Sequence, residues 1–224
     1  MFAQTTGSML KLPLYIGITC TMLAYACNKQ SLRTGDLLFQ VGQESAMGGA
    51  ITAATGGKSE LKFTHVGIAI CCEKADSVLE ATSNGGVRMT ALQEFLNKSA
   101  RMDGQPLVVA KRLKDTAGVA SAVARARTFL GQPYDYSFRP DNGKLYCSEL
   151  VWESYLAPDG RRIFPARPMN FRAADGSMPP FWNELFAKLG EEIPEGVPGT
   201  NPNDMAQDPQ LRELFRCFRR SARP

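Results

Sequence analysis

The segment GKLYCSELVWESY, residues 143–155, has Cys147 directly before a run of apolar residues with helical spacing. A cysteine at a helix N-terminus meets unpaired backbone N–H groups and the positive end of the helix dipole, and both favour the thiolate. The thiolate is the nucleophilic form of cysteine, so Cys147 is a candidate for covalent catalysis. From these residues alone, a buried structural thiol is an equally good interpretation.

His65 is the one histidine of the chain, so a catalytic cysteine with an imidazole base would have to use it. It lies in the β-type run FTHVGIAICC, and a second run, SVLEAT, follows a polar turn. An antiparallel hairpin centred near residues 72–73 puts Glu80 directly opposite His65 on the same face, with Cβ atoms roughly 5 Å apart. A carboxylate there can orient the imidazole and stabilise its protonated form. The alternative for Glu80 is a carboxylate at the rim of a strand.

Other chemistry finds little support in the sequence. GGKS in ATGGKSE resembles the end of a phosphate-binding loop, but the glycine required six positions before the lysine is Thr52. The net charge is only +4, and no basic stripe is interleaved with aromatics, so we expect no nucleic-acid partner. Cys71, Cys72, Cys147 and Cys217 lack the CxxC spacing of zinc sites, and we expect no metal and no cofactor. A disulfide between Cys147 and Cys217 is the alternative that would remove the nucleophile.

The N-terminus carries a targeting signal. An apolar run follows Lys11 and is shorter than a typical membrane span of about 20 residues, which suits the h-region of a secretory signal. Small residues precede Cys27 as in a bacterial lipoprotein processing site, so residues 1–27 are predicted to be a signal peptide with lipidation at Cys27. The mature protein is then expected in the periplasm of the bacterial cell envelope, with a lipid anchor in the membrane. An ordinary cleaved signal and an N-terminal anchor helix are the alternatives.

Apolar periodicity predicts the elements that must position Cys147 and His65. Strands are predicted over 33–42, 63–72, 77–82, the first part of 85–99, and 106–113. Helices are predicted within 43–62, in the second part of 85–99 with Thr90 as its cap, over 115–131, from Cys147, over 178–190 and over 209–218, with a loop at 193–209. The fold class is therefore α+β, a meander of four or five antiparallel strands with the helices gathered on one side.

Several motifs together resemble a known family. LGQPYDYSF with LYCSELVW resembles the nucleophile region of NlpC-type cysteine peptidases, and THVGIAI with VLEA resembles their histidine region. The common members have the cysteine segment first, whereas here it follows the histidine, as in the circularly permuted branch. TGDLLFQ and PGTNPND also resemble that branch, so residues 31–215 are similar to the YiiX-like permuted papain-like hydrolases, with a basic tail at 216–224. The resemblance implies a permuted NlpC fold, a barrel-like antiparallel sheet packed against helices.

The resemblance also implies catalytic roles. It makes Cys147, at a helix N-terminus, the nucleophile, His65 the base and Glu80 the orienting acid. Glu149 is a rival for the acid, although a carboxylate in the first turn of a helix would rather stabilise the helix dipole.

Three further residues would shape the cleft. Tyr134 matches the aromatic position that lines it, Asp135 is a candidate for substrate contact, and the backbone N–H of Ser148 would contribute to an oxyanion hole. The implied activity is hydrolysis of an amide bond in a small peptide, an amino-acid-like compound or a cell-wall fragment. The alternatives are a lipid thioesterase or acyltransferase of the lecithin–retinol acyltransferase-like type, and a non-catalytic binding module on the same fold.

Overall fold

The computed structural model describes residues 32–57, 60–72 and 76–216 of the 224-residue chain. The predicted signal peptide, with Cys27, and residues 217–224 of the predicted tail lie outside the described residues. Within the described ranges, no helix combines the length and the apolar character needed to span a membrane.

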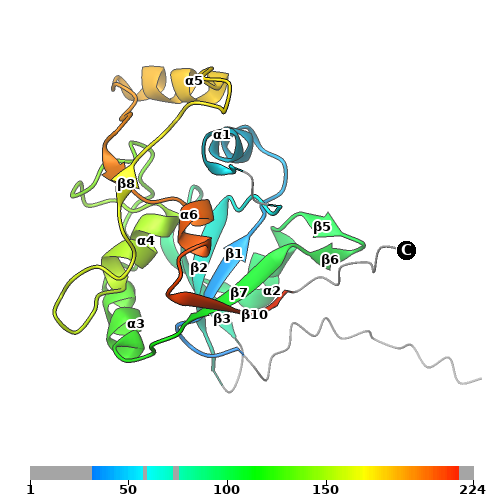
Figure 1. The fold of residues 1–224 in the computed structure, drawn as a ribbon, viewed down its shortest axis with the longest axis vertical. Helices are drawn as coiled ribbons and strands as arrows, with labels where there is room; N and C mark the ends of the chain where they lie inside the picture. The colour runs from blue at the N-terminus through cyan, green and yellow to red at the C-terminus, as the bar shows by residue number, and fades with distance from the viewer. Residues whose placement is uncertain (1–31, 58–59, 73–75, 217–224) are drawn as a thin grey trace, which may run out of the picture.

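The described chain mixes short strands and helices, as Figure 1 shows. The strands are β1 Leu37–Gln40, β2 His65–Ile70, β3 Ser77–Thr82, β4 Gly86–Ala91, β5 Arg101–Met102, β6 Gln105–Pro106, β7 Val108–Leu113, β8 Arg167–Pro168, β9 Pro198–Gly199 and β10 Leu211–Arg216. The helices are α1 Ala46–Thr55, α2 Leu92–Asn97, α3 Val119–Thr128, α4 Cys147–Ser154, α5 Pro180–Leu189 and α6 Pro202–Ala206.

One six-stranded sheet organises the domain, with the strand order β10-β7-β1-β2-β3-β4. β1 to β4 form the predicted meander, β7 pairs with the free side of β1, and β10 closes that edge. Every neighbouring pair in this sheet is antiparallel. The predicted α+β class is confirmed, and β7 is the predicted strand over 106–113; the sheet exceeds the expected four or five strands by β10 alone.

The two faces of the sheet bury different side chains, because successive residues of a strand point to opposite sides. α3 and α4 cover one face, and their apolar residues join the larger core with Phe39, Ile68 and Leu79. The expectation that all helices gather on one side is wrong for α2. Phe95 and Leu96 of α2 pack on the other face, in a smaller core built on alternate residues of β1, β2, β3 and β7.

The predicted helix over 209–218 is also wrong, since residues 211–216 form the edge strand β10. Its backbone pairs with β7, and Leu211 lies buried opposite Leu113. The apolar residues of this segment fit a helix as well as a strand. Pairing with the otherwise open edge of β7 decides in favour of the strand, because it satisfies a row of backbone N–H and C=O groups. The predicted loop at 193–209 contains the short elements β9 and α6.

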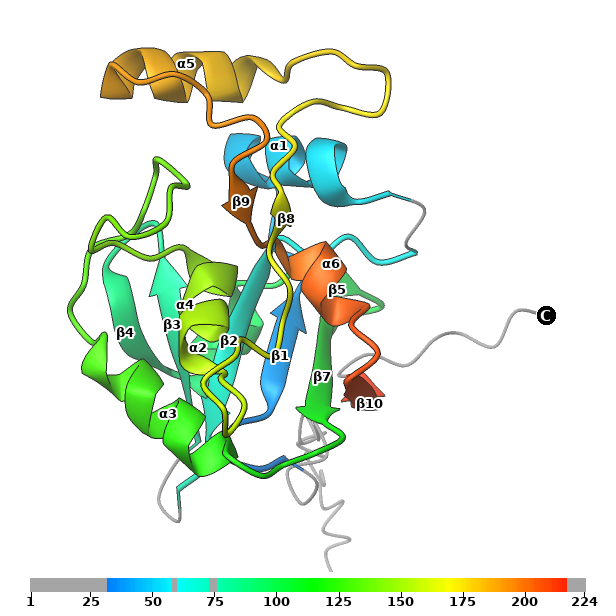
Figure 2. The same ribbon diagram turned by 60° about the vertical axis from the view of Figure 1, so that its left-hand side comes forward.

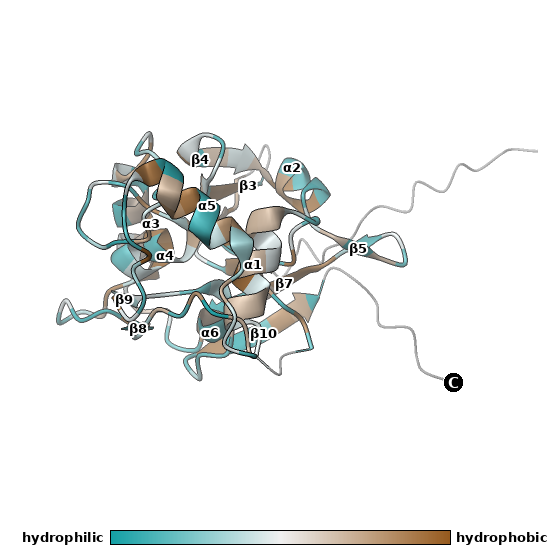
Figure 3. Cartoon of the chain, turned by 90° about the horizontal axis from the view of Figure 1, so that it is seen from above, coloured by the Kyte–Doolittle hydropathy of each residue, from teal (hydrophilic) through white to brown (hydrophobic). Residues whose placement is uncertain are grey.

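A second layer lies above the end of the sheet at which β2 begins. α1 and α5 lie one above the other there, joined to the body through β8 and β9 (Figures 1 and 2). Seen from above, α1 is mostly apolar along its length, whereas α5 alternates between hydrophobic and hydrophilic residues (Figure 3). A third core joins this layer to the body; its buried members are Ala50, Phe138, Tyr146, Phe171, Trp182 and Phe186.

The TGD motif before β1 is explained by a buried ion pair. Asp36 receives hydrogen bonds from Arg112 Nε at 2.6 Å and Arg112 Nη2 at 2.7 Å, and it also accepts the backbone N–H of Arg33. Gly35 precedes it with φ +90°, and a Cβ at this position would meet Val119 Cγ1 at 2.1 Å. The motif therefore fixes the entry into β1 and ties it to β7 and α3; it lies away from the cleft.

Candidate active site

Cys147 is the first residue of α4 and is 5% exposed. α4 begins there because Tyr146 has an extended backbone, with φ −91° and ψ 172°, and its N–H donates to the Glu149 carboxylate at 3.3 Å. Leu150 and Val151 are fully buried and anchor the helix in the main core. The first-turn N–H groups of a helix have no acceptor within it, so they surround the thiol with hydrogen-bond donors.

His65 is the first residue of β2, and its side chain is 17% exposed. Its Nε2 lies 2.6 Å from Glu80 Oε2, which leaves Nδ1 as the nitrogen available to the thiol. Burial lowers the pKa of His65, but hydrogen bonding and charge at Cys147 and Glu80 outweigh it and raise the pKa to about 10. The imidazole therefore holds its proton at neutral pH, and a protonated imidazole favours the thiolate beside it.

The contact between His65 and Glu80 is confirmed, but the predicted strand register is wrong by two residues. Ile68 lies opposite Leu79, and extending this register puts Gly67, not His65, opposite Glu80. A shift of two keeps every side chain on its predicted face, so the histidine and the carboxylate meet diagonally. Gly67 has no side chain, and a Cβ there would lie 3.4 Å from Glu80 Cβ. The absence of a side chain at Gly67 therefore leaves room for the His65 and Glu80 side chains to meet across it.

Glu80 is buried and held by more than the histidine. Thr90 Oγ1 donates to Glu80 Oε1 at 2.5 Å, and Arg88 Nε lies 3.9 Å from the same oxygen. Burial raises the pKa of Glu80, but the hydrogen bonds from His65 and Thr90 and the charge of Lys98 lower it further than burial raises it. Glu80 is thus a charged acceptor, as an orienting acid requires.

Thr90 was expected to cap a helix, and that expectation is wrong. The cap position of α2 is Ala91, and Thr90 lies in β4 opposite Val78. It reaches Glu80 because the two residues are diagonal neighbours on one face of the hairpin β3–β4. Extending the SVLEAT strand into the next hairpin would have revealed this partner from the sequence.

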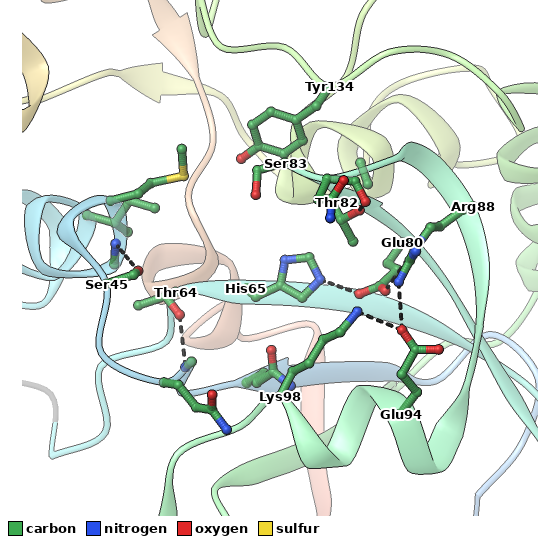
Figure 4. Close-up of a pocket in the computed structure, with 18 residues that line it drawn as sticks. Ser45, Thr64, His65, Glu80, Thr82, Ser83, Arg88, Glu94, Lys98 and Tyr134 are labelled. Carbon is green, nitrogen blue, oxygen red and sulfur yellow. Dashed lines mark hydrogen bonds and ion pairs between the residues drawn. The ribbon is translucent and has the colours of Figure 1, made fainter. Parts of the chain in front are cut away.

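Two cavities meet at these residues. The larger, of about 490 Å³, is lined by His65 and Glu80 and by the charged side chains of Arg88, Glu94 and Lys98 (Figure 4). Glu94 Oε1 lies 2.8 Å from both Arg88 Nη2 and Lys98 Nζ.

The smaller cavity, of about 40 Å³, is lined by Cys147 and mostly by apolar side chains. Tyr134, Thr64 and Ile51 line both cavities and so mark the boundary between the histidine side and the cysteine side of the site. In Figure 4 the Tyr134 ring lies above the His65 imidazole.

The three residues predicted to shape the cleft have different surroundings. Tyr134 lines the cleft, and Ser148 is fully buried and lines the smaller cavity. The position of Asp135 does not agree with the predicted contact to substrate. Asp135 is fully buried, and its carboxylate accepts from the N–H and hydroxyl of Ser137 and the N–H of Arg139. Asp135 therefore shapes the loop that presents Tyr134.

Glu149, the rival acid, lines neither of the two cavities. It is 2% exposed, and its carboxylate accepts the N–H of Tyr146. Burial, followed by the negative charge of Asp135, raises the pKa of Glu149 to about 8. Glu149 lies in the first turn of α4 and caps it through this hydrogen bond, and its stabilisation of the helix dipole stays a prediction.

Among the described residues, the cysteines Cys71, Cys72 and Cys147 are thiols that form no disulfide. The alternative partner Cys217 lies outside the described residues. Asn203 of the PGTNPND motif ties α6 to the segment before β2, since its side chain bonds both the N–H and the C=O of Phe63. This motif therefore supports the strand that begins with His65.

Comparison with known proteins agrees with this geometry. Residues 31–215 match the model of a family described as permuted papain-like amidase enzyme, YaeF/YiiX, C92 family. The chain is 28% identical over 201 residues to uncharacterized protein YiiX of Escherichia coli K12, covering 88% of this chain and 92% of that protein. A crystal structure of metalloprotein YiiX from Escherichia coli O157:H7 has a TM-score of 0.66 and 27% identity, covering 82% of this chain and 97% of the other.

The word metalloprotein describes that relative. Among the residues that this structure describes, no three or more His, Cys, Asp or Glu side chains are grouped closely enough to hold a metal ion.

Proposed function

Because the chain belongs to the permuted papain-like amidase family of YaeF and YiiX, we propose that it is a thiol hydrolase that cleaves an amide bond through an acyl-enzyme on Cys147. The convergence of Cys147, His65 and Glu80 from α4, β2 and β3 carries this proposal. Covalent acyl transfer needs a nucleophile beside a base, with the base held by a hydrogen-bond acceptor on its other side. The described part of the chain holds no cluster of His, Cys, Asp and Glu side chains suited to a metal ion, and the mechanism uses only the chain's own groups.

The reaction starts with the thiolate of Cys147 and the protonated imidazole of His65. The sulfur attacks the carbonyl carbon, and the oxyanion that forms accepts hydrogen bonds from the first-turn N–H groups of α4, including that of Ser148. His65 donates its proton to the amide nitrogen, the C–N bond breaks, and the amine leaves. His65 then takes a proton from water, whose oxygen attacks the thioester; the carboxylic acid leaves and the sulfur is regenerated. Glu80 holds the imidazole throughout.

The experiment that tests this proposal combines turnover with thiol labelling. Peptides from digested peptidoglycan are incubated with the protein, and the products are identified by mass spectrometry. Cys147→Ala and His65→Ala are expected to abolish cleavage, while each variant still unfolds cooperatively on heating. Cys147 labelling by iodoacetamide at pH 6 is expected to fall in His65→Ala. Because Cys71 and Cys72 are also thiols, labelling is counted on the Cys147 peptide. Undiminished labelling of Cys147 in the histidine variant would contradict the ion pair.

The same proteins distinguish a hydrolase from the alternative, a non-catalytic binding module. A binding module would form a covalent adduct with a thiol probe no faster in the wild type than in His65→Ala, and it would release no product. A hydrolase requires both a His65-dependent adduct and turnover.

We also propose the cellular location that the N-terminal sequence predicts, a periplasmic protein held to the membrane by a lipid on Cys27. Cys27→Ser is expected to move the protein from the membrane pellet to the soluble fraction, and to remove labelling by a fatty-acid precursor. A Cys27→Ser protein that stays lipid-labelled would contradict the anchor.

A further inference from the structure

The smaller cavity beside Cys147 contains polar atoms that the mechanism above does not use. Ser148 Oγ and the indole Nε1 of Trp182 are buried, and neither has a hydrogen-bond partner within the described residues. Both residues line this cavity, and they are 0% and 2% exposed. A buried polar group without a hydrogen-bond partner costs free energy, so such groups are rare in native proteins and usually need an explanation, such as a bound ligand. Thr200 Oγ1, at the same cavity, is a third such atom. Three unpartnered polar atoms at one cavity beside the candidate nucleophile point to a bound group that accepts their hydrogen bonds.

The rest of the lining defines the character of that group. None of the lining side chains is charged, and aromatic and aliphatic residues dominate, among them Phe138, Phe171 and Met169. The cavity volume of about 40 Å³ is about three times the roughly 10–15 Å³ needed to hold one water molecule. A group of two or three heavy atoms therefore fits, whereas a long acyl chain would force the packed aromatic layer apart.

The larger cavity has the opposite character. It holds about 490 Å³ and is lined by Arg88, Glu94 and Lys98. His65 lines this cavity, and His65 must reach the leaving nitrogen to protonate it, so the leaving amine extends into the larger cavity. Cys147 lines the smaller cavity and keeps the acyl group after the C–N bond breaks. The two cavities thus correspond to the two sides of the scissile bond.

We propose that the substrate is an amide that joins a small uncharged acyl group, bearing a hydrogen-bond acceptor next to its carbonyl, to a larger polar amine with charged substituents. The acyl side is selected by the small cavity, with Ser148 and Trp182 as donors to the acceptor. This proposal rests on the proposed hydrolase function and names its substrate class. It also opposes the lipid acyltransferase alternative, because a fatty acyl chain does not fit beside Cys147.

The test uses covalent labelling, so that it does not depend on turnover. Acyl chloromethyl ketones alkylate the thiol: the new S–C bond displaces chloride, and the acyl substituent enters the small cavity. The series is glycolyl, propanoyl, 4-methylpentanoyl and octanoyl, in which glycolyl and propanoyl have nearly the same size and only glycolyl bears the acceptor oxygen. The rate of Cys147 adduct formation is measured by mass spectrometry, with Cys147→Ala as the blank.

Propanoyl is expected to react about 10- to 100-fold faster than 4-methylpentanoyl and octanoyl, because overpacking a core is costly. Met169→Ala enlarges the cavity and is expected to restore fast labelling of Cys147 by the 4-methylpentanoyl reagent. Met102→Ala is the matched control, since Met102 is 43% exposed on β5. Octanoyl labelling as fast as propanoyl labelling in the wild type would overturn the size limit.

Glycolyl is expected to react about 2- to 10-fold faster than propanoyl, the effect of one net hydrogen bond. Trp182→Phe removes the indole N–H but keeps an aromatic ring and the Ser148 hydroxyl, and it is expected to lower this ratio. Because the ratio is taken within one protein, a general loss of stability or thiol reactivity cancels. Equal rates for the two reagents in the wild type would overturn the proposal that the cavity recognises a hydrogen-bond acceptor.

The outcomes also separate this inference from the proposed function. Size-selective labelling without cleavage of any amide would refute hydrolysis and keep the subsite. Cleavage without selection would refute the subsite alone.

Discussion

The contribution of Glu80 can be tested by replacing it with glutamine, which keeps its size and removes its charge. Glu80 is 1% exposed and accepts hydrogen bonds from His65 at 2.6 Å and Thr90 at 2.5 Å. A hydrogen bond to a charged partner contributes about 1.5–3 kcal/mol and a neutral one about 1 kcal/mol. Glu80→Gln therefore removes about 0.5–2 kcal/mol of imidazolium stabilisation, which corresponds to roughly 2- to 30-fold in kcat/KM.

The assay follows kcat/KM and the rate of Cys147 alkylation from pH 5 to pH 10. The hydrogen bond from His65 to Glu80 raises the pKa of the imidazole, so its loss is expected to lower the pH at which the imidazole releases its proton. Alkylation of the variant at pH 6 is expected to slow by the same factor as kcat/KM. Asp159→Asn, which changes an exposed carboxylate, serves as the control. A Glu80→Gln protein with wild-type rates across this range would refute an orienting role for Glu80.

Stability gives a second readout with a defined sign. The pKa of folded His65 is about 10, above its ordinary 6.5. The stability from its protonation is therefore fully present below about 6.5 and is lost as the pH rises through about 10. Urea unfolding at pH 6 and pH 9.5 is expected to show a smaller loss in Glu80→Gln than in the wild type. An equal loss in both would mean that Glu80 does not hold the imidazole proton.

Three further predictions concern the scaffold and the neighbours of the site. Arg112→Met leaves Asp36 as a buried charge without its partner and is expected to cost about 3–5 kcal/mol in urea unfolding; a loss below about 1 kcal/mol would contradict this. Gly86→Ala puts a Cβ 2.1 Å from Gln132 O at φ +65° and is expected to lower stability by more than about 1 kcal/mol and to slow turnover, since this contact seats the loop that carries Tyr134. Thr90→Val is expected to lower kcat/KM by about 2- to 10-fold, less than the complete loss expected on removal of His65.

The sequence was sufficient to predict that His65 and Glu80 meet, which the structure shows. One histidine in the chain left no choice of base, and the alternation of apolar residues fixed the faces of β2 and β3, so His65 and Glu80 were expected together. The register itself was not determined, because a shift of two residues keeps every side chain on the same face. The hairpin turn carries no Asn-Gly or Gly-rich signal that would fix the pairing.

The remaining differences arise from contacts between distant parts of the chain. Nothing local shows that residues 211–216 will find the open edge of β7, or that Asp135 will turn inward to hold its own loop. Glu149 reads as an exposed first-turn carboxylate until its burial beside Asp135 is seen. The small cavity could not be predicted, because it forms where α4 meets aromatic residues from 138 to 182.

The position of Cys147 after His65 and Glu80 has a consequence for how the reactive thiol is made. During synthesis the chain emerges from its N-terminal end, and neighbouring strands such as β1 to β4 pair through short connections before distant contacts close. The base and its acid therefore stand assembled before the segment with the cysteine arrives. Until α4 docks, Cys147 lacks the imidazolium and is expected to behave as an ordinary thiol, so its nucleophilic strength depends on contacts that form after β2 and β3 have paired. The permuted order thus protects the unfinished chain from its own chemistry.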